Sequence, residues 1–492
     1  MQEDWVTVDA TILPSSGRRH AAVALMIATA MQAFDSTIAN VALPQLEQSL
    51  GGGIDLGSWV MTSYLCASAV MATLTGWFRR RYGARQSFAG AIALFVLASL
   101  LCSIAPSPAA LIQFRLVQGA AAGIIQPLAQ AILLDIYPKK HHGRMLAIWG
   151  ATIMAGPIMG PVLGGVITDL ASWRWIFVLN VPLGMIAILG LGQVPASSEL
   201  ARKARIDGIG ILLLVIGVGS LQLSLERSIG RTWPPSAEIV VEAIIAVFAL
   251  SVIALRSIRS RFALFRFEVF RDINFATSVF YNFMVGALVF TTIVFLPALS
   301  EGPLGYDATR AGLTISPRGI GTMATMLAVG YLIDKVDHRA LLVAGMLITA
   351  AAFELMSQMP PDRSEIWLTG ASAVQGVGVG LLFTPLSTLA FSSLAPDLRT
   401  DAAGVYSLLR QLGCATGVAA MTALLQAKVQ TYSMAIAGQG VIPEGSSRLR
   451  DMATFGAYTG CFRTMAVITA VIIPGIFLFR VLRPDPALPT IV

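Results

Sequence analysis

The sequence predicts an all-α polytopic membrane protein with about fourteen transmembrane helices. Of its 492 residues, 55% are hydrophobic and only 12% are charged, and the mean hydropathy is +0.73. A soluble protein carries about 25% charged residues, so this composition excludes the soluble class. The apolar residues gather into runs of about 20 residues, the length that crosses a bilayer. The second part of the chain also repeats motifs of the first part.

The apolar runs account for the predicted helices one after another. They lie at about 20–44, 57–77, 87–105, 109–136, 145–168, 175–195, 208–225, 238–256, 273–296, 311–333, 340–357, 366–391, 404–426 and 464–482. The seventh run is the weakest, because glycine and serine dilute it. The first twenty residues lack the basic-then-apolar order of a cleaved signal peptide.

Lysine and arginine predict the orientation of the chain, because they are enriched in cytoplasmic loops. Alternate loops carry most of them: RRRYGAR (79–85), PKKHHGR (138–144), ARKAR (201–205) and RSIRSRFALFRFEVFR (256–271). The opposite loops carry fewer, many of them in a long loop predicted at 427–463. We therefore expect a plasma (inner) membrane protein with both termini in the cytoplasm. The net charge of +7 follows from this topology, and nucleic-acid binding is excluded because no basic folded face is available.

Two pairs of similar segments predict two related halves. QGAAAGIIQPLAQAIL (118–133) resembles QGVGVGLLFTPLSTLA (375–390), and GWFRRRYGAR (76–85) resembles GYLIDKVDHR (330–339). The alternative is chance similarity between glycine-rich helices. Related halves predict a site at their interface, near the bilayer midplane, that opens alternately to each side. The predicted domains are a cytoplasmic tail 1–19, a six-helix bundle 20–200, a linker with two additional helices 201–260, a second six-helix bundle 261–482 and a tail 483–492.

Five motifs in chain order carry a family resemblance. They are FDSTIANVALP (34–44), GWFRRRYGAR (76–85), RLVQGAAAGIIQP (115–127), GPIMGPVLGG (156–165) and WRWIFVLNVPLG (173–184). Over residues 18–482 the chain resembles the major facilitator superfamily, and more narrowly its fourteen-span drug:proton antiporters of the EmrB/QacA type. The resemblance implies the major facilitator fold, with two six-helix bundles plus two extra helices. It also implies proton-coupled export by alternating access, energised by the proton gradient without a cofactor.

Asp35 lies inside the first apolar run, where a carboxylate costs about 2.5–3.5 kcal/mol or more. We interpret it as the group that carries the coupling proton, and we expect it to face the cavity between the halves. Arg115, at the place of the family's helix 4 arginine, lies at a similar depth and is its predicted partner. The alternatives are a locally paired Asp35 without a transport role and an Arg115 that only makes structural hydrogen bonds.

Two further motifs predict residues that gate the transport cycle. In the 76–85 loop, Arg80 stands where the superfamily usually has an acid, whereas the second copy keeps an acid at Asp334. The alternative for this loop is an anchor on anionic lipid, worth about 1 kcal/mol per basic residue. In the helix 5 motif, Gly160 and Gly164 are expected to pack against the opposite half on the periplasmic side, and the alternative is ordinary packing of small residues. The predicted gating set is Gly76, Arg79, Arg80, Arg81, Gly83, Arg85 and Asp334 in the loops, with Gly156, Gly160, Pro161, Gly164 and Gly165 on helix 5.

Other polar residues inside the apolar runs are weaker candidates. Arg410, which with Arg115 is counted inside the spans, is expected to snorkel at the cytoplasmic end of its helix. Glu226 is expected at the membrane interface. Seven more residues are candidates for lining the cavity: Gln118, Gln126, Gln130, Asn180, Asn282, Glu354 and Gln375.

The sequence shows no sign of an enzyme. It has no G-x-x-x-x-G-K-[ST] loop, no catalytic cluster and no metal-ligand spacing among its four cysteines. The predicted function is a proton-coupled exporter of amphipathic or lipophilic molecules, with protons and the bilayer as its other partners. In a host with two membranes, the resemblance implies a periplasmic adaptor and an outer-membrane channel. The alternatives are a lipid or metabolite transporter on the same scaffold and a membrane receptor or scaffold that has lost transport.

Overall fold

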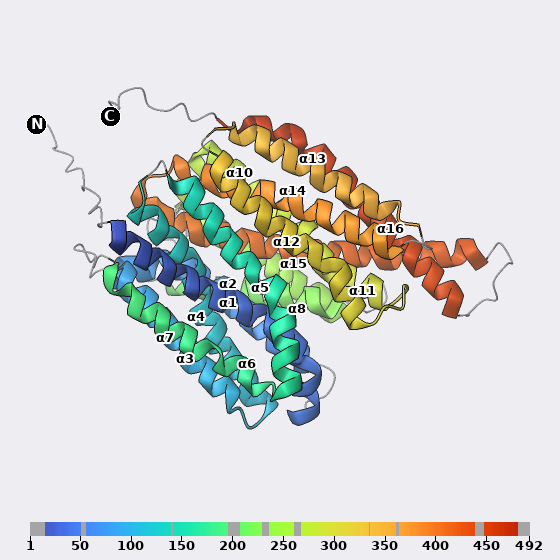
Figure 1. The fold of residues 1–492 in the computed structure, drawn as a ribbon, viewed down its shortest axis with the longest axis horizontal. Helices are drawn as coiled ribbons and strands as arrows, with labels where there is room; N and C mark the ends of the chain where they lie inside the picture. The colour runs from blue at the N-terminus through green and yellow to red at the C-terminus, as the bar shows by residue number, and fades with distance from the viewer. Residues whose placement is uncertain are drawn as a thin grey trace, which may run out of the picture.

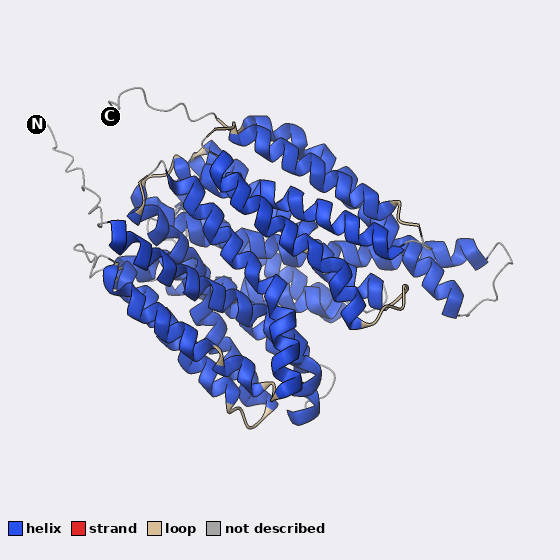
Figure 2. Cartoon of the chain, viewed as in Figure 1, coloured by secondary structure: helices blue, strands red, loops and turns tan. Residues whose placement is uncertain are grey.

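The computed structural model describes residues 15–50, 56–138, 141–194, 207–228, 236–259, 267–333, 335–360, 364–437 and 447–480. These residues form helices joined by short connections, and this described part contains no strand (Figure 2). The predicted all-α fold class is therefore confirmed. The long helices run roughly along one direction and fan out from one end of the molecule (Figure 1).

Seven helices come from the first 190 residues. They are α1 (Ser15–Leu50), α2 (Leu56–Tyr82), α3 (Ala84–Ser103), α4 (Pro108–Ile136), α5 (His142–Leu170), α6 (Arg174–Val178) and α7 (Asn180–Gly190), followed by the short η2 (Leu191–Gln193). α1 packs against α5 and α7, and α4 packs against α2 and α3. We call this group, α1 to α7, the N-half.

The remaining helices form an inserted pair and a second group. The pair is α8 (Gly208–Ser228) and α9 (Ala237–Arg259). The second group, the C-half, comprises η3 (Phe267–Arg271), α10 (Ile273–Val289), α11 (Thr291–Glu301), α12 (Ala308–Leu332), α13 (His338–Ser357), α14 (Ser364–Ser392), α15 (Pro396–Ala437), α16 (Ser447–Ile472) and η5 (Ile473–Leu478). In the C-half, α14 packs against α12 and α13, and α15 packs against α10 and α16.

Local sequence explains where several helices begin. The Ser107 side chain accepts a hydrogen bond from the Ala110 amide at the start of α4, where Pro108 fills the first turn. Asp272 and Asp307 cap α10 and α12 in the same way. α2 and α3 are separated by Gly83 alone, whose positive φ of 84° favours glycine.

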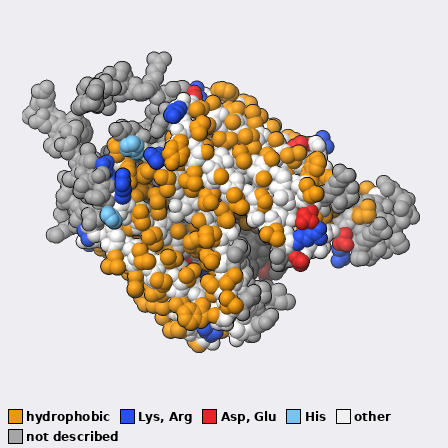
Figure 3. All heavy atoms as spheres, viewed as in Figure 1, with side chains coloured by type: hydrophobic (Ala, Val, Ile, Leu, Met, Phe, Trp, Pro, Cys, Tyr) orange, Lys and Arg blue, Asp and Glu red, His pale blue; other side chains and the backbone are white. Residues whose placement is uncertain are grey.

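Within the described residues, nine helices are long and apolar enough to cross a membrane, and two shorter apolar helices cover 174–190 and 208–224. Three further helices, α2, α5 and α12, are 27, 29 and 25 residues long, which is also enough to cross a bilayer. The predicted count of about fourteen spans is compatible with this arrangement. Hydrophobic side chains cover most of the face seen in Figure 3, between basic side chains at the left and mixed charges at the right.

The prediction of a long loop at 427–463 is wrong for the described residues in this range. α15 continues to Ala437 and α16 already begins at Ser447, so the two helices form a hairpin that projects beyond the bundle (Figure 1). The hydropathy criterion missed these helical turns because it detects runs that are apolar on every face, whereas a helix can form with apolar residues on one face only.

The inserted pair lies on the outer side of the bundle. α8 packs against α2 and α15, and α9 packs against α8. Leu214, Val218 and Ile253 of the pair join Val70 of α2 and Leu408 of α15 in one apolar cluster. An ion pair of 3.0 Å between Arg256 and Asp207 joins the adjacent ends of the two helices. The pair therefore covers the contact between α2 and α15 from outside, and the exact domain boundaries stay a prediction.

The apolar cores show how the two halves meet. One large core contains residues of both halves and lies at the end where α1 begins, which we call the basic end because Arg79 and Arg80 lie there. At the opposite end the halves have separate cores, one around Phe177 in the N-half and one around Phe353 in the C-half. The halves are thus joined at the basic end and packed independently at the other.

Candidate functional site

Asp35 lies at the centre of a buried polar cluster in the N-half. Its Oδ2 atom accepts a hydrogen bond from Arg115 Nη1 at 2.7 Å, and its Oδ1 atom accepts from Gln118 Nε2 at 2.9 Å and from Asn180 Nδ2 at 2.8 Å. Its side chain is only 2% exposed. The structure therefore brings four sequence-predicted candidates together: Asp35, Arg115, Gln118 and Asn180.

The family motif at 173–184 positions Asn180 through a helix break. α6 ends at Val178 and α7 begins at Asn180, so the amide lies at a helix start and reaches Asp35. Asn180 Nδ2 also donates to Ser99 Oγ at 2.9 Å, which joins α3 to the cluster. Five buried polar side chains from α1, α3, α4 and α7 thus bond one another, and only Arg115 Nε among their atoms is a buried donor without a partner in the described residues.

Two aromatic rings enclose the Arg115 guanidinium. Its central carbon lies 5.2 Å from the centre of the Tyr64 ring and 4.9 Å from that of Phe177, distances at which a cation interacts with an aromatic face. Arg115 is 1% exposed and also donates to Gln118 Oε1 at 3.0 Å. The Asp35–Arg115 pair is therefore closed to solvent in this conformation.

The expectation that Asp35 faces the space between the halves is not met in this conformation. Positions 33 and 37 of α1 lie on one face of the helix and pack against α5, where Thr37 Oγ1 donates to the Gly156 carbonyl at 3.0 Å. Position 35 is rotated by about 200° from position 33 and points instead toward α4 and α7. Asp35 therefore points into the N-half.

The C-half carries a related polar cluster without an acid. Gln375, which matches Gln118 in the internal repeat, bonds Thr292 at 3.1 Å, and Arg318 Nη1 donates to the same hydroxyl at 2.8 Å. Thr292 and Gln375 are fully buried, whereas Arg318 is half-buried. Sequence reasoning missed Arg318. The signal was present, because this arginine follows Pro317 well inside the 311–333 run.

Arg410 is not at the end of its helix, so its expected snorkelling is wrong. α15 begins at Pro396, which places Arg410 about 21 Å along the helix axis. Its Nη2 donates to Gln126 Oε1 of α4 at 3.2 Å, a contact between the halves. Its guanidinium carbon also lies 6.0 Å from the ring centres of both Phe290 and Phe383.

The basic loop contacts both halves at the basic end. Arg80 Nη1 lies 2.6 Å from Asp401 Oδ2, at the start of α15. Arg79 binds Asp135 of α4 at 2.7 Å and donates to Thr400 Oγ1 at 2.7 Å. The basic residue at position 80 therefore has an acid from the opposite half as its partner, a residue that sequence reasoning did not single out. The other sequence-predicted acid, Asp334, lies outside the described residues.

The remaining residues of this loop have simpler roles. Gly76 leaves room for Asp401, since a Cβ atom there would lie 1.5 Å from Asp401 Oδ1. Arg81 lies over the Tyr82 ring at 5.6 Å, and Arg85 is half-buried just after Gly83.

The helix 5 glycines pack within the N-half, contrary to expectation for Gly160. A Cβ atom on Gly156 would lie 2.5 Å from the Ala33 carbonyl oxygen, and one on Gly160 would lie 2.2 Å from Thr37 Oγ1. Gly164 is buried and its carbonyl accepts from Thr168 at 2.8 Å, whereas a Cβ atom on Gly165 would have no neighbour within 4 Å. α5 continues without interruption through Pro161. These glycines bring α1 and α5 together.

A different face of α5 contacts the C-half. A Cβ atom on Gly330 of α12 would lie 2.7 Å from Ala147 Cβ, and one on Gly319 would lie 2.4 Å from the Ile158 side chain. A Cβ atom on Gly143 would lie 2.6 Å from Ile333. The two helices therefore run antiparallel at close range from the basic end to about the middle of α5. We call this the α5–α12 contact.

The other cavity candidates lie apart from these clusters. Asn282 is buried and donates to the Tyr406 carbonyl at 2.8 Å within the C-half, and Gln130 is buried in α4. Glu354 bonds Gln358 near the end of α13, a helix that packs against α14 and α16. The side chain of Glu226 lies outside the described residues.

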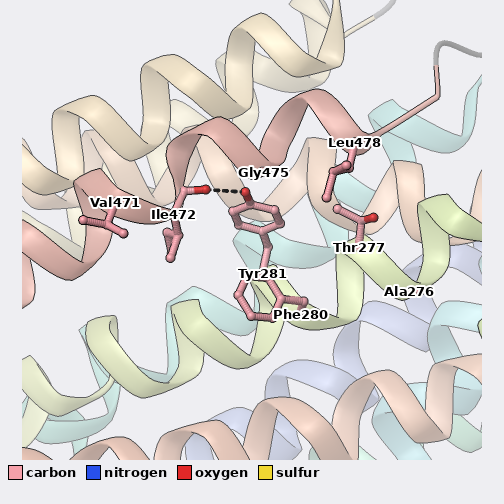
Figure 4. Close-up of a pocket in the computed structure, with 8 residues that line it drawn as sticks. All are labelled: Ala276, Thr277, Phe280, Tyr281, Val471, Ile472, Gly475 and Leu478. Atoms are coloured by element: carbon pink, nitrogen blue, oxygen red, sulfur yellow. Dashed lines mark hydrogen bonds between the residues drawn. The ribbon is translucent and has the colours of Figure 1, made fainter.

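One surface groove lies away from the interface between the halves. It is lined by α10 and the end of the chain's last helical segment, with Phe280, Ile472 and Leu478 on its walls (Figure 4). Tyr281 crosses its base and donates to the Ile472 carbonyl at 2.5 Å. Its lining is largely apolar and holds no charged side chain among the described residues.

Comparison with known proteins places these features in a family. A model of the Major Facilitator Superfamily matches residues 25–418. The chain is 36% identical to "Multidrug export protein EmrB" of Haemophilus influenzae over 81% of this chain and 79% of that protein. It is 33% identical to "Fatty acid resistance protein FarB" of Neisseria gonorrhoeae over 82% and 80%. The structure of the proton:xylose symporter XylE matches with a TM-score of 0.62 at 14% identity, covering 94% of this chain and 96% of that one, which shows a shared fold.

Proposed function

Because this chain belongs to the Major Facilitator Superfamily, and within it to the EmrB-type exporters, we propose that it expels lipophilic or amphipathic toxic compounds in exchange for protons. The chain is a multi-pass membrane transporter and not an enzyme. The names of its relatives, which refer to multidrug export and fatty acid resistance, support this range of substrates. The plasma membrane is the proposed location, with the basic end and both termini in the cytoplasm, as the basic loops favour.

In this orientation the described conformation is closed toward the cytoplasm. The shared core, the α5–α12 contact and the Arg80–Asp401 ion pair all lie at the basic end. The opposite end has no shared core among the described residues. Alternating access then requires these cytoplasmic contacts to separate while the outer ends approach each other.

Asp35 is the proposed carrier of the coupling proton, and the observation that carries this proposal is its ion pair with Arg115. A proton on Oδ2 would remove the negative charge that Arg115 binds and turn an acceptor into a donor. Arg115 would then lose its charged partner inside a buried site. Such a change is costly unless the helices rearrange, because an uncompensated buried charge is strongly unfavourable.

The contacts of α1 link this proton to the gate. Asp35 joins α1 to α4, while Thr37, two residues further on, bonds the Gly156 carbonyl of α5. α5 in turn forms the contact with α12 of the C-half. A shift of α1 on protonation of Asp35 would therefore act on the helix that holds the halves together. The cycle draws its energy from the proton gradient and needs no cofactor.

Transport in proteoliposomes tests this function. The purified full chain is reconstituted with an imposed pH gradient and supplied with an anionic, a neutral and a cationic lipophilic dye: anilinonaphthalene sulfonate, Nile red and ethidium. We expect movement of at least one dye against its gradient, coupled to proton flux and independent of ATP. Absence of coupled movement for all three dyes would contradict the exporter proposal and favour a lipid or metabolite transporter. In a host with two membranes, co-purification would test for a periplasmic adaptor and an outer-membrane channel.

A further inference from the structure

Arg410 and Arg318 are two arginines inside apolar helices without an acidic partner among the described residues. Each donates one hydrogen bond to a neutral group: Arg410 to Gln126 and Arg318 to Thr292. By contrast, Arg79, Arg80 and Arg115 all bind carboxylates. A guanidinium offers five N–H donors, so most of the donors of the two arginines have no partner within the described part of the chain.

The surroundings of Arg410 combine elements of both halves. Gln126 comes from α4 of the N-half, whereas Phe290, Phe383 and Arg410 come from three segments of the C-half. Phe290 occupies the one-residue interruption between α10 and α11. Arg410 is half-buried and lies about 21 Å along α15 from Pro396. With the start of α15 at the cytoplasmic surface, as proposed, this is near the middle of a bilayer that is about 40–45 Å thick with its headgroups. This is where repeat-built transporters hold their substrates.

The second arginine lies close enough to make the same region positive. Arg318 and Gln375 of α14 both bond Thr292, and Arg410 lies beside Phe383 of the same helix. Gln375 and Phe383 are eight residues apart, or about 12 Å along α14. The only described acid buried at comparable depth is Asp35, and its oxygens are occupied by Arg115, Gln118 and Asn180. As far as the structure describes the chain, the interface therefore offers uncompensated positive charge and no available carboxylate.

We propose that Arg410 binds the anionic group of amphipathic substrates, with Arg318 as a second positive charge along the same path. The inference rests on the proposed export function, because it takes the interface between the halves as the place where substrates bind. A carboxylate accepts two parallel hydrogen bonds from one guanidinium, and Gln126 adds an amide from the other half. Phe290 and Phe383 supply flat apolar surfaces for the body of the substrate. The assigned class is an organic anion with an aromatic or aliphatic body.

Binding of a matched pair of probes tests the assignment. The full chain in lipid nanodiscs is titrated with 1-naphthylacetate and with its neutral amide by isothermal titration calorimetry. We expect the carboxylate to bind about tenfold or more tightly than the amide, the increment of a charged hydrogen bond. Arg410→Gln should remove this preference while leaving the affinity for the amide unchanged. Arg410→Lys should keep part of it, because the charge remains but the planar fork is lost.

The controls separate this inference from the export function. Arg310→Gln, at an exposed arginine paired with Glu365, should leave the preference unchanged. Equal affinity of the parent for both probes, or a full preference in Arg410→Gln, overturns the anion site. If Arg410→Gln does not fold, Arg410→Lys and Arg318→Gln decide, and an undiminished preference in both overturns it. If the parent moves Nile red with protons but shows no preference for the carboxylate, only the anion site is refuted. If the parent prefers the carboxylate but moves none of the three dyes with protons, only the export function is refuted.

Discussion

At Asp35, both carboxylate oxygens are occupied by donors from the same half of the molecule. Two neutral amides and the Arg115 guanidinium donate to this carboxylate, and Arg115 supplies the opposite charge. A proton can replace Arg115 only if the site opens. The residue therefore couples its protonation to a local rearrangement, which a free carboxylate in a water-filled cavity would not require.

Replacing Asp35 with Asn keeps the size and polarity of the side chain but removes its titration. We expect Asp35→Asn to bind substrate, to lose uphill efflux and to lose the protons released when substrate is added to purified protein. Glu354→Gln is the control, because this acid lies near a helix end and bonds Gln358. Proton release from Asp35→Asn equal to that of the parent would place the coupling site elsewhere.

Removing the cation tests the other side of the same pair. Arg115→Ala takes away the positive charge that Asp35 binds, so the pH profile of substrate-induced proton release should differ from that of the parent. The measurement is proton release across pH in purified protein. An unchanged pH profile would mean that the 2.7 Å contact has no part in coupling.

At the scale of elements, the glycines of the helix 5 motif allow α1 to pack closely against α5. Gly156 and Gly160 leave no gap between α5 and α1, whereas Gly165 on the same helix has open space around it. The motif therefore divides into positions that require glycine and at least one that does not. Small residues allow such close approach of membrane helices, which gains dispersion contacts between the backbones.

This division predicts opposite results for two equivalent substitutions. Gly160→Leu should strongly reduce efflux while the protein still reaches the membrane, because the side chain would force α1 and α5 apart at a cost of about 1–3 kcal/mol. Gly165→Leu should keep near-parent efflux. Dye efflux normalised to membrane protein measures both. Equal loss in the two variants would show that the α1–α5 contact is not the reason.

At the scale of the whole molecule, an ion pair joins the halves at the basic end. Its charges are reversed relative to the pattern expected for the superfamily, in which the loop position of Arg80 usually carries an acid. Arg80 of the N-half binds Asp401 of the C-half, so a basic residue in the 76–85 loop can serve this contact when the acid is on the other side. Arg80 is partly exposed, and the pair is therefore worth at most a modest free energy by itself.

A charge exchange tests this contact. Arg80→Asp and Asp401→Arg each place like charges together and should lower efflux, whereas the double variant should recover part of it. Arg85→Asp is the control within the same loop. A double variant no better than either single variant would indicate that the pair is incidental to the cycle.

A covalent link tests whether the halves must separate. Cysteines at Ala147 and Gly330, where α5 and α12 are in contact, should form a disulfide under oxidation and stop transport, and a reductant should restore transport. A gel shift confirms the link, and the two single variants control for the bulk of the thiol at Gly330. Full transport by the oxidised double variant would contradict alternating access through this contact.

The sequence alone was sufficient to predict most of the helices and the family. The run predicted at 109–136 is α4 (Pro108–Ile136), and 340–357 is α13 (His338–Ser357). Hydropathy is a local property of the chain and the bilayer imposes a fixed length, so these boundaries need no knowledge of packing. The same local character identified Asp35 and Arg115 as anomalies, since a charge inside an apolar run is visible without a structure.

Only the tertiary structure decided where those charges point and what they bind. Asp35 faces its own half because α1 turns its small-residue face to α5. Arg410 meets Gln126, and Arg80 meets Asp401, across 284 and 321 positions of sequence. Such partners depend on the rotation and register with which whole helices pack, and hydrophobic patterning leaves both open. The charge that a substrate would meet at the interface is therefore a property of the assembled halves.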